Sequence, residues 1–167
     1  MKVTFDVPHS YYLPQYSTVV RELSRRGVHA RALMYEGGDM PIKETVAAEL
    51  GIEFDVVADG AEALAHHIQS APDWVVFGND FKGLKQLPKG TRSALLFHGS
   101  GTGVKRASLS PGLAEFDTRF VSGYGLMKIF REHFPQVDLV EVGFAKLDEL
   151  RSDEGLARIR LDLEALG

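Results

Sequence analysis

A glycine-rich segment in the second half of the chain, from His98 to Lys105 (HGSGTGVK), has the residue types that bind phosphate groups. Glycines let backbone N–H groups approach an anion closely, and Ser100, Thr102 and Lys105 add further donors. The spacing matches neither common nucleotide motif: the glycines alternate, and Lys105 is followed by Arg106 where a Walker A loop has Ser or Thr. The segment therefore predicts an anion-binding loop, with a flexible connection that binds no ligand as the alternative.

Two histidines could act on a substrate or hold it. His98 begins the glycine segment, and because histidine titrates near neutral pH it can accept a proton from an attacking hydroxyl. The alternative, that the His98 ring only fixes a turn, is equally open. His9 and Ser10 follow Pro8 at the end of the first apolar run. His9 could bind an acceptor or orient a phosphate, although Pro-His-Ser is also common turn chemistry.

Two other clusters are expected to be structural. His66 and His67 are adjacent, so on a helix they point to different sides and do not form a metal pair; a solvated helix position is expected for them. No group of His, Asp or Glu has the spacing of a metal site, so no metal ligand is predicted. Tyr11, Tyr12 and Tyr16 could line an acceptor groove, but aromatic residues at the start of a helix more often anchor it to the core.

These residues sit between regularly alternating strand and helix patterns. Near-continuous apolar runs rich in β-branched and aromatic residues predict the strands, and apolar residues spaced for one face predict the helices. The strands are expected at 2–7, 28–35, 52–57, 73–77, 94–97, 119–121 and 139–142. The helices are expected at 15–26, 41–50, 60–69, 124–133 and 153–166, with Gly27 and Gly51 as C-terminal stops.

This alternation predicts the α/β class, with a single doubly wound, mostly parallel sheet that carries helices on both faces. In such sheets ligands bind outside the C-terminal ends of the strands, at the crevice where the winding reverses. Small and polar residues follow nearly every expected strand. They are Pro8-His9-Ser10, Glu36-Gly37-Gly38, Gly78-Asn79-Asp80, His98-Gly99-Ser100, Ser122-Gly123 and Gly143-Phe144.

Charge and composition exclude several kinds of partner and site. The chain has 167 residues, and its 19 basic and 23 acidic residues give a formal net charge of -4. Because phosphate neutralisation needs a basic surface, nucleic acid is not expected as a partner. The absence of cysteine excludes a disulfide framework, a thiolate metal site and a cysteine nucleophile, and it fits a cytoplasmic protein. No apolar run approaches the length of a membrane-spanning helix.

Four segments that follow strands, read in order, resemble a known family. They are FDVPHSYYLPQY (5–16), LLFHGSGTGVKRASLSPGL (95–113), FDTRFVSGYG (116–125) and LVEVGFAKLD (139–148). Their order is similar to that in the N-terminal half of the CDP-glycerol glycerophosphotransferases, which resemble GT-B glycosyltransferases and build teichoic-acid-type polymers. The resemblance implies a Rossmann-like domain in which His98 is the catalytic base. It also implies a set of substrate- or phosphate-binding residues: His9, Ser10, Gly99, Ser100, Gly101, Thr102, Lys105, Ser122, Gly123, Gly143, Lys146 and Asp148.

The resemblance further implies that residues 1–167 are the acceptor-side domain of a transferase, inactive alone, with a second, donor-nucleotide domain beyond residue 167. The implied partners are CDP-glycerol, bound mainly by that second domain, and a polyol-phosphate or glycolipid acceptor. CMP would be the leaving group, and no cofactor is implied. The implied location is the cytoplasm, with peripheral contact of the full-length protein at the inner face of the membrane left open.

Two alternatives remain. The first keeps the GT-B architecture with a nucleotide sugar as donor. It is motivated by Lys105, which lies seven residues after His98 where the family has five, and by Lys146, which stands where the family has Arg. Lysine does not offer the bidentate fork of arginine. The second alternative is a non-catalytic α/β domain that binds a small anionic ligand through the glycine segment.

Overall fold

A computed structural model describes residues 1–97 and 111–148 of the chain. His98, the glycine segment to Lys105 and the last expected helix lie outside the described residues. The expected strands and helices within the described ranges are all present, and their ends agree with the expected ones to within two residues. The strands are β1 (Lys2–Val7), β2 (His29–Tyr35), β3 (Glu53–Val57), β4 (Trp74–Phe77), β5 (Arg92–Leu96), β6 (Thr118–Val121) and β7 (Asp138–Glu141).

The helices of the described ranges connect these strands. The α-helices are α1 (Leu13–Arg25), α2 (Met40–Leu50), α3 (Gly60–Ser70) and α4 (Tyr124–His133). Short 3-10 turns are η1 (Ser10–Tyr12), η2 (Leu84–Gln86), η4 (Pro111–Glu115) and η5 (Ala145–Leu147). Gly27 and Gly51 follow α1 and α2 with φ of 70° and 61°, a left-handed conformation that favours glycine and ends a helix.

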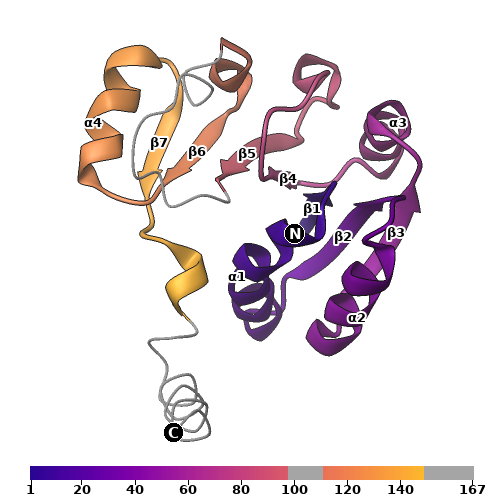
Figure 1. The fold of residues 1–167 in the computed structure, drawn as a ribbon. Coiled ribbons are helices and arrows are strands. Elements are labelled where there is room, and N and C mark those ends of the chain that lie inside the picture. The colour runs from indigo at the N-terminus through magenta and orange to yellow at the C-terminus, as the bar shows by residue number, and fades with distance from the viewer. Residues whose placement is uncertain (98–110, 149–167) are drawn as a thin grey trace, which may run out of the picture.

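The seven strands form one sheet in the order β3-β2-β1-β4-β5-β6-β7, and every neighbouring pair is parallel (Figure 1). The chain runs outward from β1 through β2 to β3, crosses back to place β4 beside β1, and then continues outward to β7. The winding therefore reverses between β1 and β4. The doubly wound sheet expected from the sequence is confirmed.

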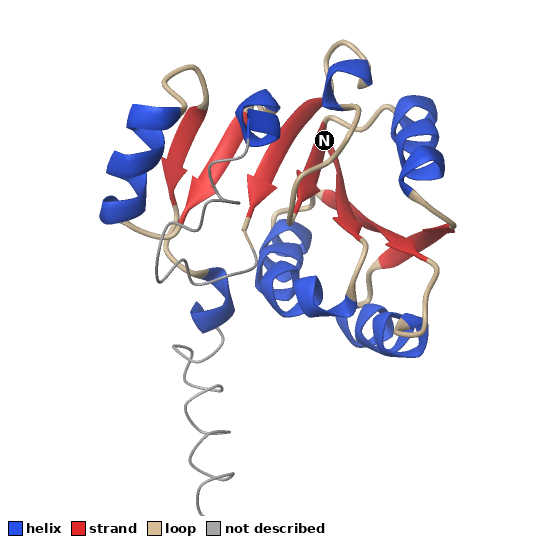
Figure 2. Cartoon of the chain, turned by 45° about the horizontal axis from the view of Figure 1, so that its top comes forward, coloured by secondary structure: helices blue, strands red, loops and turns tan. Residues whose placement is uncertain are grey.

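Helices cover both faces of the sheet (Figure 2). Helices α1 and α2 cover one face, where Phe5 of β1 and Val76 of β4 belong to their core. Helices α3 and α4 cover the other face, where Val75 and Phe77 of β4 contribute. Because successive side chains of a strand point to opposite faces, each central strand supplies both cores. This explains why these strands are nearly continuous apolar runs.

Candidate functional site: the C-terminal edge of the sheet

The C-terminal ends of all seven strands lie at one edge of the sheet, because every neighbouring pair is parallel. Helices α1, α2, α3 and α4 follow β1, β2, β3 and β6 directly, so their N-termini face this edge (Figure 1). A helix N-terminus carries partial positive charge and favours anions. Of the residues expected to bind substrate, His9 and Ser10 follow β1, Ser122 and Gly123 follow β6, and Gly143 follows β7. The structure thus brings them to one edge.

A buried lysine fastens the segment that follows β1. The side chain of Lys43, on the first turn of α2, is fully buried. Its Nζ donates to the main-chain oxygen atoms of Pro8 at 3.0 Å and Tyr35 at 2.7 Å, and lies 2.8 Å from Oδ1 of Asp39. Oδ2 of Asp39 in turn accepts from the backbone N–H of Ser10 at 2.7 Å. We call these bonds the Lys43 clamp; they join the ends of β1 and β2 to the start of α2.

The clamp also sets the charge of its carboxylate. The Lys43 ammonium, followed by the Ser10 N–H, lowers the pKa of Asp39 to about 2. Asp39 is therefore ionised at neutral pH, and the clamp is a charged pair. Neither residue is among those predicted from the sequence, although an Asp and a Lys four positions apart at the start of a helix, just after a strand, are a recognisable signal.

A buried tyrosine packs against the end of β4, where the winding reverses. Tyr12 is 1% exposed, and its ring lies so close to Gly78, the first residue after β4, that a Cβ there would be 2.5 Å from Tyr12 Cε1. Tyr16 is equally buried, and its hydroxyl donates to the main-chain oxygen of Asp6. The expectation that these tyrosines anchor the helix to the core is confirmed for Tyr12 and Tyr16. Tyr11, by contrast, is 49% exposed.

A buried acid lies directly below this edge. Asp6, the penultimate residue of β1, is 3% exposed; its Oδ2 lies 3.2 Å from Nε2 of His67 and accepts from the Tyr35 hydroxyl at 3.1 Å. Burial raises the pKa of Asp6 above its ordinary value, while the contacts with His67 and Tyr35 act in the opposite sense. Burial of the Tyr35 hydroxyl, together with the nearby Asp6 carboxylate, raises the pKa of Tyr35.

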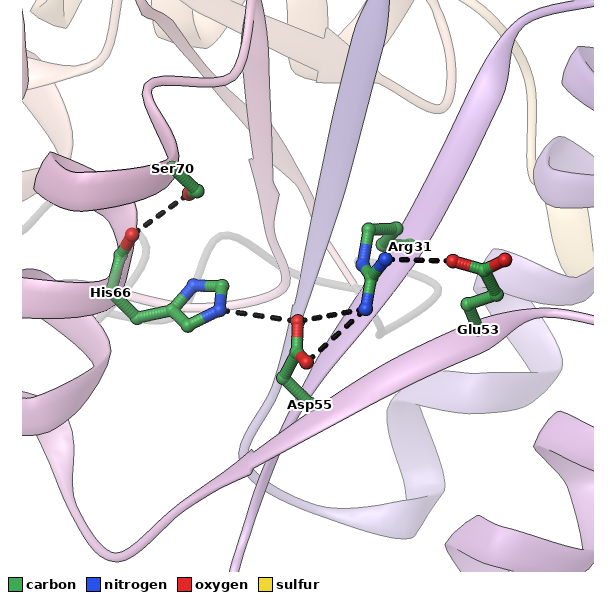
Figure 3. Close-up of polar contacts among 5 residues, drawn as sticks. All are labelled: Arg31, Glu53, Asp55, His66 and Ser70. Carbon is green, nitrogen blue, oxygen red and sulfur yellow. Dashed lines mark hydrogen bonds and ion pairs between the residues drawn. The ribbon is translucent and has the colours of Figure 1, made fainter.

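The expectation that His66 and His67 are solvated is wrong for His67, whereas the side chain of His66 is 27% exposed. His67 is fully buried, because α3 turns it onto β1, where Asp6 supplies a polar partner and Phe77 and Phe81 pack edge-on to its ring. His66 points to β3 and places Nε2 3.1 Å from Oδ2 of Asp55 (Figure 3). The two rings do point to different sides, as expected, and each has the carboxylate of a strand residue as its partner.

Figure 3 shows that the His66 contact belongs to a longer polar network over β2 and β3. Arg31 of β2 donates to both carboxylate oxygens of Asp55 at 3.1 Å and to Glu53 at 2.7 Å. These side chains are about one-third to two-thirds exposed, so their pairs contribute little to stability individually. The network covers the strand β3, which is an outer strand of the sheet.

A buried arginine of β6 packs against aromatic rings near this edge. Arg119 is fully buried, and its guanidinium lies 3.6 Å from the ring centre of Phe130 on α4 and 4.9 Å from that of Phe97. This burial lowers the pKa of Arg119 to about 10. Ser122 and Gly123, which follow β6, are half-buried and lead into α4, where the oxygen of Gly123 accepts from the N–H of Met127.

The segment after β7 returns to α1. Gly143 takes a φ of 74°, and in η5 the main-chain oxygen of Ala145 accepts from the Thr18 hydroxyl at 3.3 Å. Asp148 borders a pocket of about 290 Å³ along α1, together with Thr18, Val19, Glu22, Leu23 and Arg26. The main chain of Lys146 lies in η5. Lys146 and Asp148, expected to bind substrate, thus lie on the segment that packs against the side of α1.

The remaining expected site residues, His98, Gly99, Ser100, Gly101, Thr102 and Lys105, lie outside the described residues, so their roles stay predictions. Within the part of the chain that the structure describes, no three His, Asp or Glu side chains are grouped as a metal site would require. In the same ranges no helix is long and apolar enough to cross a membrane.

Comparison with solved structures identifies the architecture. UDP-GlcNAc 2-epimerase from Neisseria meningitidis, solved bound to UDP-GlcNAc, matches with a TM-score of 0.59 and 12% identity, over 97% of this chain and 54% of that chain. A structure from Listeria monocytogenes assigned as a UDP-N-acetylglucosamine 2-epimerase matches with a TM-score of 0.63 and 14% identity, over 90% and 46%. The fold is GT-B-like. This chain spans about half the length of these GT-B-like structures. No protein-family model matches the chain, and no curated protein matches its sequence.

Proposed function

We propose that this GT-B-like chain is the acceptor-side domain of a transferase that uses a nucleotide-activated donor. The observation that carries the proposal is the winding reversal between β1 and β4. It places Pro8-His9-Ser10 and Gly78-Asn79 side by side at an edge faced by four helix N-termini. The similarity to about half of two UDP-GlcNAc 2-epimerase structures supports a role in nucleotide-linked chemistry, with a second domain that supplies the remaining half of the site.

The donor we assign first is CDP-glycerol, on the resemblance of the segments after β1, β5, β6 and β7 to the glycerophosphotransferases. In that reaction an acceptor hydroxyl oxygen attacks the β-phosphorus, and a new P–O bond forms. The bond from that phosphorus to the oxygen of the leaving CMP breaks, and the hydroxyl proton passes to His98 as base. Such a step depends mainly on positioning and on electrostatic stabilisation of phosphate oxygens, which helix N-termini supply.

The second candidate is a nucleotide sugar, and the fold comparison favours it. One of the two matched structures was solved with UDP-GlcNAc bound. The parts of the edge that the structure describes suit either donor, because helix N-termini and a fastened β1 segment recognise phosphate oxygens irrespective of the group attached to them.

A donor panel tests the proposal. The complete polypeptide encoded by the source gene is incubated with a polyol-phosphate or glycolipid acceptor and with CDP-glycerol, UDP-GlcNAc or another nucleotide-linked donor, and release of CMP or UDP is measured by chromatography. Release of CMP from CDP-glycerol alone supports the first donor, and release of UDP from a nucleotide sugar supports the second. If no donor is turned over but one binds, the non-catalytic alternative replaces the proposal. Full activity of the His98→Ala variant would remove His98 as the base.

A further inference from the structure

The segment after β1 is held more firmly than a turn requires. The Lys43 clamp fixes the main chain at Pro8 and Ser10 from the side of α2. From the side of β4, the Tyr12 ring is seated against Gly78, where the absence of a Cβ leaves room for it. Burying a charged ammonium carries a desolvation cost, which the three partners of Lys43 offset only while the segment stays in this position. Such rigidity is typical of segments that position a ligand.

This rigid segment displays two rings to solvent. His9 is exposed and Tyr11 is 49% exposed, and their rings stack with centroids 5.1 Å apart and planes 18° apart. The Tyr11 ring also packs against Tyr12 at 4.5 Å, and its hydroxyl donates to the Tyr12 hydroxyl at 3.3 Å, which fixes the orientation of the ring. Since Tyr12 and Tyr16 already anchor α1, the Tyr11 ring is not needed for that purpose.

The location of the pair points to a ligand. Tyr11 contacts Tyr12, which packs against Gly78 where the winding reverses. Tyr12 also hydrogen bonds to the Asn79 side chain after β4. Ligands of doubly wound sheets bind at this crevice, outside the carboxyl ends of the strands. Aromatic side chains there bind rings through their faces, and the polar groups nearby, the His9 ring and the Asn79 amide, can bond to polar groups at a ring edge.

We propose that His9 and Tyr11 form a subsite that stacks on a ring of the substrate, a ring with an apolar face and a polar edge. A nucleobase and a sugar ring both have this chemistry. The inference rests on the proposed function, since it assigns the ring to a molecule handled at the C-terminal edge. In this arrangement His9 and Tyr11 contact the ligand, and Lys43 and Asp39 act as positioning residues.

Calorimetric titration of the chain tests the proposal with three probes: UMP, CMP and N-acetylglucosamine. The Tyr11→Ala variant should bind at least one probe about 5-fold or more weakly than the wild type, because a stacked ring contributes on that order. Tyr11→Phe keeps the ring and should stay within about 2-fold of the wild type. Replacement of the exposed His29, which lies at the start of β2 and thus at the opposite edge, is the control: His29→Ala should leave all affinities unchanged.

The probes separate the two sources of the ring. A Tyr11-dependent loss for UMP and CMP alone identifies a nucleobase, and a loss for N-acetylglucosamine alone identifies a sugar. Equal binding of every probe by wild type and Tyr11→Ala would overturn the inference, as would the absence of any binding at millimolar concentrations. If the nucleotides bind independently of Tyr11, this subsite is wrong while the proposed function stands. If Tyr11-dependent binding occurs but the complete polypeptide turns over no donor, the proposed function is wrong while the subsite stands.

Discussion

Replacing Lys43 with methionine tests the clamp at the end of β1. Methionine has a similar length and no charge, so Lys43→Met removes the ammonium and leaves the volume filled. The Nζ of Lys43 has three partners: the main-chain oxygens of Pro8 and Tyr35, and the carboxylate of Asp39. Because the lysine side chain is 0% exposed, water cannot simply take its place at the two carbonyl groups.

The expected decrease in the free energy of unfolding follows from these contacts. Each bond from a charged donor to a carbonyl group contributes roughly 1.5 kcal/mol, so the two carbonyls account for about 3 kcal/mol. The Asp39 side chain is 28% exposed, and its pair adds at most about 1 kcal/mol after screening. These bond contributions are net of the desolvation of the ammonium, so no separate cost is subtracted. We therefore expect Lys43→Met to lower the free energy of unfolding by about 3–4 kcal/mol.

Urea unfolding at neutral pH, followed by circular dichroism, measures this loss. Lys85→Met is the matched control, since Lys85 is 78% exposed and pairs with Glu115; it should lower the free energy of unfolding by less than about 0.5 kcal/mol.

Unfolding in acid provides a second test of the clamp. The low pKa of Asp39 contributes stability that is present above the ordinary carboxyl range and is lost as the pH falls toward about 2. The difference in the free energy of unfolding between Lys43→Met and wild type should therefore be smaller in acid than at neutral pH. A loss under about 1 kcal/mol at neutral pH would refute the clamp.

Two further substitutions test the crevice and the acid below it. Gly78→Ala would place a Cβ 2.5 Å from Cε1 of Tyr12 and should lower the free energy of unfolding by about 1–3 kcal/mol in the same urea assay. Gly38→Ala, whose Cβ would meet nothing within 4 Å, is the control, and equal losses in the two variants would contradict the close packing. Because burial raises the pKa of Asp6, its contribution is complete in acid and is lost as the pH rises through its folded-state pKa. Asp6→Asn should therefore remove part of the loss of stability that occurs as the pH rises above about 4, and an identical pH profile for variant and wild type would contradict the raised pKa of Asp6.

The fold was largely predictable from local signals. The apolar runs of β1 and β4 end at Pro8 and Gly78, and Gly27 and Gly51 end helices as expected. The alternation of strand and helix required a parallel sheet, and parallel pairing alone places the segments after β1, β4, β6 and β7 at one edge. Those features depend on residues close in the sequence, or on chain direction, so the sequence contains them directly.

The contacts that shape the edge were not predictable in the same way, because they join distant residues. Lys43 bonds to an oxygen 35 positions earlier, and His67 meets a carboxylate 61 positions earlier. On a helix, Lys43 and His67 have the same local pattern as solvated residues. Only the packing of α2 and α3 against β1 buries them. The His67 prediction was wrong for this reason, whereas Tyr12 and Tyr16 were assigned to the core correctly from residue type.

Mapping of ligand contacts by amide chemical shifts tests the central claim, that the C-terminal edge of the sheet binds a nucleotide-linked ligand. The isotopically labelled chain is titrated with CDP-glycerol and, separately, with UDP-GlcNAc. We expect at least one of them to shift the amide signals of Ser10, Asn79 and Gly123, which lie at this edge, and to leave those of Asp73 and Gly90 unchanged. Asp73 and Gly90 precede β4 and β5 and so lie at the opposite edge. No shifts with either ligand, or shifts confined to the opposite edge, would contradict the account.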